Sequence, residues 1–118
     1  MTELITCLSG KKENWNYVIK LIEDNNWDKI IIVVDDCGEK NLKVNKKIEL
    51  IIVDSNKPLV ELAKDIRGKL TGKINGIEVA VNFVSGNGKE HMALMGALLK
   101  LGIGVRFVAL TPAGIEQI

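Results

Sequence analysis

The sequence has no large excess of charge of either sign, and it has little arginine. Its 118 residues carry 16 Lys and Arg against 15 Asp and Glu, which gives a net charge of +1. Arg67 and Arg106 are the only arginines. A protein that binds duplexes nonspecifically neutralises many phosphates with basic side chains. The small net charge therefore argues against duplex nucleic acid as a partner.

Cysteines and uninterrupted apolar runs are also scarce. Cys7 and Cys37 lack the spacing of a metal site or a redox pair. We therefore expect a core thiol and a loop thiol, no metal and no cofactor, in a reducing cytoplasm. The longest apolar stretch, 92–110, is interrupted by Lys100 and Arg106, so it predicts a helix, a turn and a strand instead of a membrane span. The N-terminus shows no secretory signal, and we expect no membrane partner.

The residues that are present indicate one globular domain over 1–118. Hydrophobic residues make up 47% of the chain and charged residues 26%, which is typical of a chain with its own core. Short runs rich in β-formers predict strands at 4–8, 29–34, 48–53, 77–84 and 105–110. Apolar periodicity predicts helices over 13–26, from Pro58 to Gly72, and from the 85–88 loop to Gly102. The buried face expected for the second helix consists of Leu59, Leu62, Ala63, Ile66 and Leu70.

The arrangement of these elements predicts the fold class. The run 29–34 is apolar on both faces, as expected for a strand inside a parallel sheet that helices cover on each side. The last helix carries two candidate buried faces, one of Met92, Met95, Leu98 and Leu99, and one of the small residues Ala93, Gly96 and Ala97. We expect an α/β fold, a Rossmann-like three-layer domain with about five mostly parallel strands and helices on both faces.

Ligands of open parallel sheets bind beyond the carboxyl ends of the strands. Small polar residues or glycine fill all five loops expected there, at 9–12, 35–38, 54–57, 85–89 and 111–112. Loop 85–89 gives the strongest signal, because its glycines let backbone amides approach an anion at a helix N-terminus, where Lys89 adds positive charge. The alternative is a tight turn in which glycine only satisfies the backbone. The loop matches neither a Walker A motif nor a dinucleotide fingerprint, which argues against ATPase and dehydrogenase functions.

Three further features keep alternatives open. His91, the only histidine, is interpreted as a polar contact or cap in preference to a catalyst. Asp35 and Asp36 follow a strand, where they could hold magnesium as in a receiver-like domain or simply solvate a turn. Segment 35–47 carries four lysines that could close over an anion or form a solvated loop.

The stretch Val79–Leu99 resembles the CRISPR-associated Rossmann-fold (CARF) ligand-sensing domains. The resemblance is carried by Asn82, Ser85, Gly86, Gly88, Lys89 and Met92, and Ser9–Gly10 fits the other ligand-binding loop of that family. It implies a homodimer whose paired strand-end loops bind a cyclic oligoadenylate or a similar phosphate-bearing ligand in antiviral defence. The candidate ligand-binding residues are then Ser9, Gly10, Ser85, Gly86, Asn87, Gly88, Lys89 and Thr111.

The resemblance also implies a candidate activity, that of a metal-independent ring nuclease. Ser9 would position the ribose hydroxyl or the phosphate, and Lys89 would neutralise the charge that develops on the phosphate. Two alternatives remain: a sensor that passes its signal to a partner, and a non-catalytic interaction module or small subunit whose glycines are purely structural.

Overall fold

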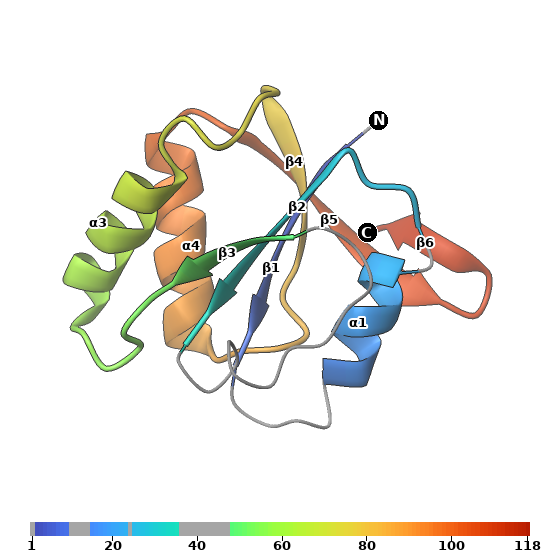
Figure 1. Ribbon diagram of the computed structural model, residues 1–118, viewed down its shortest axis with the longest axis horizontal. Coiled ribbons are helices and arrows are strands. Elements are labelled where there is room, and N and C mark those ends of the chain that lie inside the picture. Colours follow the sequence, from blue (N-terminus) through green and yellow to red (C-terminus); the bar gives the residue numbers. More distant parts are fainter. Residues whose placement is uncertain (1, 10–14, 24, 36–47) are drawn as a thin grey trace.

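The computed structural model describes residues 2–9, 15–23, 25–35 and 48–118 (Figure 1). Their strands and helices follow the order β1 (Glu3–Leu8), α1 (Trp15–Glu23), β2 (Lys29–Val34), β3 (Glu49–Ile52), α3 (Leu59–Leu70), β4 (Glu78–Asn82), α4 (Gly88–Lys100), β5 (Gly104–Thr111) and β6 (Gly114–Gln117). Cys37, Gly10 and the lysines of segment 36–47 lie outside the described residues.

The strands form one sheet in the order β3-β2-β1-β4-β5-β6. Strands β1 to β5 are parallel, and β6 pairs antiparallel with β5. In the central register, Ile5 of β1 lies between Ile31 of β2 and Val81 of β4. The prediction of an α/β fold with a mostly parallel sheet is therefore confirmed, and the order of the strands is compatible with a Rossmann-like fold.

Two apolar clusters contain alternate residues of the strands, as expected because successive side chains of a strand point to opposite faces. One cluster joins Ile5, Ile31 and Val81 to buried side chains of α3 and α4. The other joins residues such as Leu4 and Ile32 to Trp15 and its neighbours on α1. Figure 1 shows α3 and α4 beside each other.

Two expectations about the elements need correction. The described chain has six strands instead of about five, because a short hairpin after Thr111 adds β6 at the edge of the sheet. The buried face of α4 is made by Ala93, Leu94, Ala97 and Leu98, whereas Met92 and Leu99 of the expected stripe are 65% and 66% exposed. Small side chains are buried because they let the helix pack closely.

Of the buried face predicted for α3, Leu62, Ile66 and Leu70 are buried, and Leu59 and Ala63 are partly buried. Gly102 follows the last turn of α4 with φ +74°, as expected for a glycine that ends a helix. Among the described helices, none combines the length and apolar character that crossing a membrane requires.

Candidate functional site

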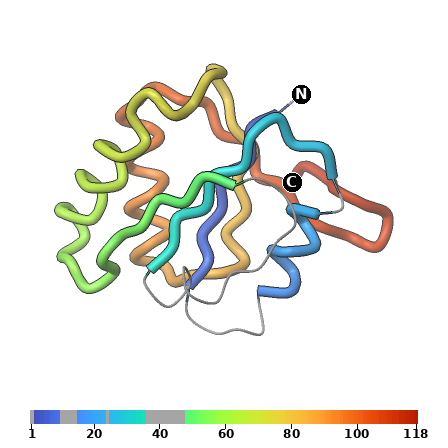
Figure 2. The backbone as a smooth tube through the Cα atoms, viewed as in Figure 1, coloured from blue at the N-terminus to red at the C-terminus, as the bar shows by residue number. Residues whose placement is uncertain are grey.

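The order of the sheet defines one topological switch point. The chain progresses from β1 through β2 to β3 on one side, and from β4 through β5 to β6 on the other. Figure 2 lets the reader follow this reversal along the backbone. In open α/β sheets ligands bind where the order reverses, beyond the carboxyl ends of the two strands that flank it. Here these strands are β1 and β4.

Two serines join the loops after β1 and β4. The backbone amide of Ser9 donates to Ser85 Oγ at 3.2 Å, and Ser85 Oγ donates to the Ser9 carbonyl at 3.1 Å. Both residues are buried, with exposed fractions of 4% and 0%. The structure thus brings together two of the residues predicted from sequence, although they lie 76 positions apart.

A buried carboxylate completes this group, and sequence reasoning missed it. Glu90 is 5% exposed, and its Oε1 accepts hydrogen bonds from Ser9 Oγ at 2.6 Å and from the Asn87 amide at 3.0 Å. The Glu90 amide in turn donates to Asn87 Oδ1 at 2.9 Å. This reciprocal pair is a capping box, and the spacing of Asn87 and Glu90 by three residues is the signal that could have revealed it.

The capping box leaves two backbone donors at the start of α4. An α-helix has four N-terminal amides without intrahelical acceptors, and the first intrahelical bond of α4 runs from the His91 amide to the Asn87 carbonyl. The amides of Asn87 and Glu90 are satisfied by the capping box. Within the described residues, the amides of Gly88 and Lys89 have no protein acceptor, so they can donate to water or to a bound group.

The two described glycines of this loop have different structural requirements. Gly86 has φ +99°, and an added Cβ would lie 2.9 Å from His91 Nε2 and 3.3 Å from the Cys7 Cβ. Glycine is therefore required there by the fold. At Gly88, an added Cβ would meet no described atom within 4 Å, and φ is not positive. The fold of the described chain does not explain the glycine at position 88.

Lys89 does not join the two serines. Its Nζ donates to the Ser55 carbonyl at 2.9 Å, in the loop after β3. In the described part of the chain, no hydrogen bond or ion pair links Lys89 to Ser9, the other residue proposed for catalysis. Lys89 instead connects the first turn of α4 to a neighbouring hollow at the same edge of the sheet.

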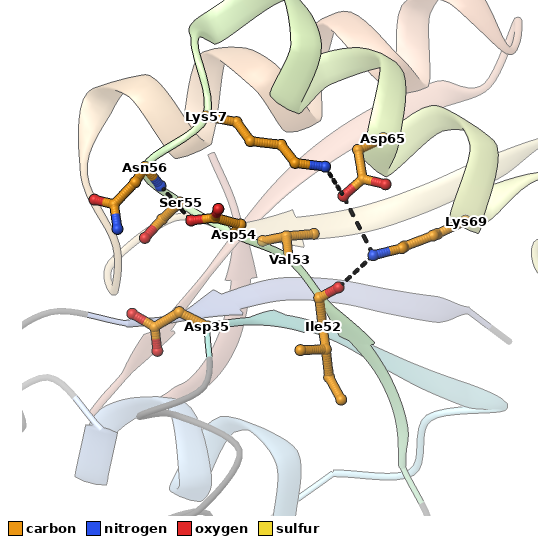
Figure 3. Close-up of a pocket in the computed structure, with 9 residues that line it drawn as sticks. All are labelled: Asp35, Ile52, Val53, Asp54, Ser55, Asn56, Lys57, Asp65 and Lys69. Atoms are coloured by element: carbon orange, nitrogen blue, oxygen red, sulfur yellow. Dashed lines mark hydrogen bonds and ion pairs between the residues drawn. The ribbon is translucent and has the colours of Figure 1, made fainter.

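That hollow is a polar cleft beyond β2 and β3, with a volume of about 380 Å³ (Figure 3). Its lining residues are Asp35, Ile52, Val53, Asp54, Ser55, Asn56, Lys57, Asp65 and Lys69. Asp65 pairs with Lys57 at 3.8 Å and with Lys69 at 3.2 Å. The lining residues carry three carboxylates and two ammonium groups, so the net charge of the lining is negative. The cleft suits donors such as sugar hydroxyls better than it suits phosphate.

His91 makes a polar contact, in agreement with the sequence-based interpretation. Its Nε2 lies 2.8 Å from the Ser85 carbonyl, and its ring stacks on Phe83 with centroids 4.6 Å apart. Cys7, a core thiol as predicted, lies beneath this group at 1% exposure. Burial, and secondarily the charge of Glu90, raises the pKa of the Cys7 thiol, so the thiol stays protonated.

Thr111 lies apart from the serines. Its Oγ1 donates to the Gly114 carbonyl at 2.9 Å and accepts from the Ala113 amide at 3.2 Å, which fixes the turn between β5 and β6. No hydrogen bond to Ser9 or Ser85 is found for it among the described residues. The described residues also contain no cluster of three His, Cys, Asp or Glu side chains placed to hold a metal ion.

Comparison of the sequence with models of known protein families and with curated proteins finds no match in either case.

Proposed function

We propose that the chain binds a nucleotide signal of the cyclic oligoadenylate type and acts as a homodimeric sensor in CRISPR-linked defence. We also propose that the domain is a Rossmann-like three-layer structure, a view supported by the separate apolar clusters around α1 and around α3 and α4. The function rests on one observation: at the switch point of the sheet, the start of α4 has two amides without an acceptor among the described residues. The resemblance to CARF domains supplies the class of ligand.

The first step of the argument concerns the phosphate. The Gly88 and Lys89 amides lie at the N-terminus of a 13-residue helix, where the macrodipole favours an anion. Without a side chain, Gly88 lets a phosphate oxygen approach the backbone closely. Lys89 adds a positive charge from the same turn of the helix, with its Nζ at the Ser55 carbonyl. Glu90 weakens this attraction, but its Oε1 carboxylate oxygen is turned back toward Ser9 and Asn87.

The second step concerns the nucleoside. The acidic cleft beyond β2 and β3 carries Asp35 at the end of β2, where doubly wound folds place a carboxylate that binds ribose hydroxyls. Ser55 lines this cleft and accepts the hydrogen bond from Lys89. A nucleotide with its phosphate at α4 therefore has an adjacent polar cleft for its sugar.

Binding without cleavage is better supported than ring-nuclease activity. Both residues proposed for catalysis already use their polar groups, Ser9 Oγ on Glu90 and Lys89 Nζ on the Ser55 carbonyl. For cleavage, the Ser9 hydroxyl would have to release Glu90 before it could donate to the ligand, whereas the Lys89 ammonium keeps two further N–H donors. A binding function uses the two amides, the open approach at Gly88 and the charge of Lys89, and it leaves the Ser9–Glu90 hydrogen bond in place.

A second candidate function has its own supporting observation. The positive φ of Gly86 and the close approach of its neighbours account for one glycine of the loop without any ligand. This favours the alternative of a non-catalytic interaction module. The alternative predicts that no anion binds at Gly88 and Lys89.

The test is a thermal-shift titration with cyclic tri-, tetra- and hexa-adenylate, with AMP and ATP as controls. A ligand at about a hundred times its Kd stabilises the protein by about 2.7 kcal/mol. We expect a shift with one cyclic species that is lost in Lys89→Ala and reduced in Gly88→Leu. Lys100→Ala, which removes a lysine from the opposite end of α4, serves as the matched control and should keep the shift. No shift with any cyclic species would contradict the proposal.

A further inference from the structure

The outer surface of α3 and α4 carries an apolar groove that the nucleotide proposal does not use. The two helices lie side by side and pack against each other (Figure 1). The groove between them has a volume of about 330 Å³. Its lining residues are Leu59, Val60, Ala63, Lys64, Arg67, Met92, Gly96, Ala97 and Lys100. Val60 and Met92 are each 65% exposed, which is a large exposure for apolar side chains that lie so close together.

The floor of the groove is open because of a glycine that the fold does not require. Gly96 lies inside α4, where glycine destabilises a helix by about 1 kcal/mol relative to alanine. Its φ is not positive, and an added Cβ would meet no described atom within 4 Å. Any side chain at this position would project into empty space. The glycine therefore keeps the groove open at a cost in stability.

All charged residues that line the groove are basic. Lys64, Arg67 and Lys100 carry these charges, and within the described residues none of the three forms an ion pair. The neighbouring Lys57 and Lys69, by contrast, both pair with Asp65. The groove is thus an apolar channel between cationic side chains that have no anionic partner in the described part of the chain.

We propose that this groove binds an amphipathic helix of a partner protein, with acidic residues flanking its apolar face. Helices dock into such grooves through apolar side chains spaced three or four residues apart, and carboxylates on both flanks would meet Lys64, Arg67 and Lys100. A second copy of this chain fits less well. A two-fold dimer places the same patch on both subunits, so the basic rims would face each other.

The test uses a fluorescently labelled helical peptide with leucines along one face and glutamates on both flanks. A second peptide, identical except for lysines in place of the glutamates, measures the role of charge. Fluorescence anisotropy should show that the acidic peptide binds at least tenfold more tightly than the basic one. Its affinity should fall as salt is added, because the rim charges are screened.

Two glycine variants separate the groove from general effects on helix stability. Gly96→Leu fills the floor and should weaken binding of the acidic peptide at least tenfold. Gly68→Leu is the matched control: Gly68 also lies inside a helix with open space around it, but it does not line the groove. This control should change the affinity less than twofold. Gly96→Ala serves as a milder variant that retains the fold.

Three results would overturn the proposal. The first is equal affinity for the acidic and basic peptides, and the second is unchanged binding in Gly96→Leu. The third is a dimer in sedimentation velocity that Gly96→Leu dissociates, since the groove would then be occupied by a second copy. None of these results depends on nucleotide binding, so this proposal can fail while the proposed function stands.

Discussion

Replacing Gly86 with alanine is expected to destabilise the protein strongly, whereas the same change at Gly88 is not. Gly86 has φ +99°, which a residue with a Cβ adopts only under strain. That strain is worth about 1–3 kcal/mol. The new Cβ would also lie 2.9 Å from His91 Nε2, the atom that contacts the Ser85 carbonyl. Displacing the histidine adds about 1 kcal/mol for the disturbed hydrogen bond.

The expected loss for Gly86→Ala is therefore about 2–4 kcal/mol in the free energy of unfolding. At about 4 °C per kcal/mol for a domain of this size, the Tm should fall by about 8–16 °C. Gly88→Ala places a methyl group in open space at the first position of α4, so it should be neutral or stabilise by about 0.5–1 kcal/mol. Urea unfolding followed by circular dichroism measures both variants.

Two outcomes would refute this reasoning. Gly86→Ala with a stability within about 0.5 kcal/mol of the parent chain would mean that the loop relaxes without strain. A loss for Gly88→Ala as large as that for Gly86→Ala would mean that the fold requires glycine at both positions. If Gly88→Ala retains stability and the larger Gly88→Leu loses nucleotide binding, then the second glycine serves the ligand.

Three further predictions concern buried or charged side chains. Ser9→Ala removes a buried hydrogen bond to the Glu90 carboxylate and should lower the free energy of unfolding by about 1.5–3 kcal/mol; a loss below about 0.5 kcal/mol in urea unfolding would contradict the role of this bond. With the chain's other cysteine replaced by serine, Cys7 should react with a thiol reagent only after unfolding, because it is buried and its pKa is raised; fast labelling of the native protein would be inconsistent with this. The hydrogen bond from Lys73 lowers the pKa of Glu49 more than desolvation raises it. The stability that the charged Glu49 adds at neutral pH is therefore lost as the pH falls below the ordinary glutamate value. Glu49 is partly exposed, so the effect should stay below about 1 kcal/mol and should vanish in Glu49→Gln when stability is measured against pH.

Local pattern in the sequence determined most of the elements. The apolar run at 29–34 and the stripe of Leu62, Ile66 and Leu70 depend on residues within one strand or one helix, so their periodicity predicted them. The polar loops at the carboxyl ends of the strands were also predictable, because a parallel sheet places them at one edge. The loops that contain Ser9 and Ser85 were identified on this ground, and the structure joins the two serines.

Only the tertiary structure decided the features that depend on partners distant in the chain. β6 is short and contains Glu116 and Gln117, so its strand conformation comes from pairing with β5 and not from its own residues. The two possible faces of α4 have similar apolar content, and close packing selected the face with Ala93 and Ala97. The role of Glu90 was decided in the same way. Its capping box is local, but the burial of its carboxylate depends on Ser9, which lies 81 positions away and reaches it only because β1 and β4 are neighbours in the sheet.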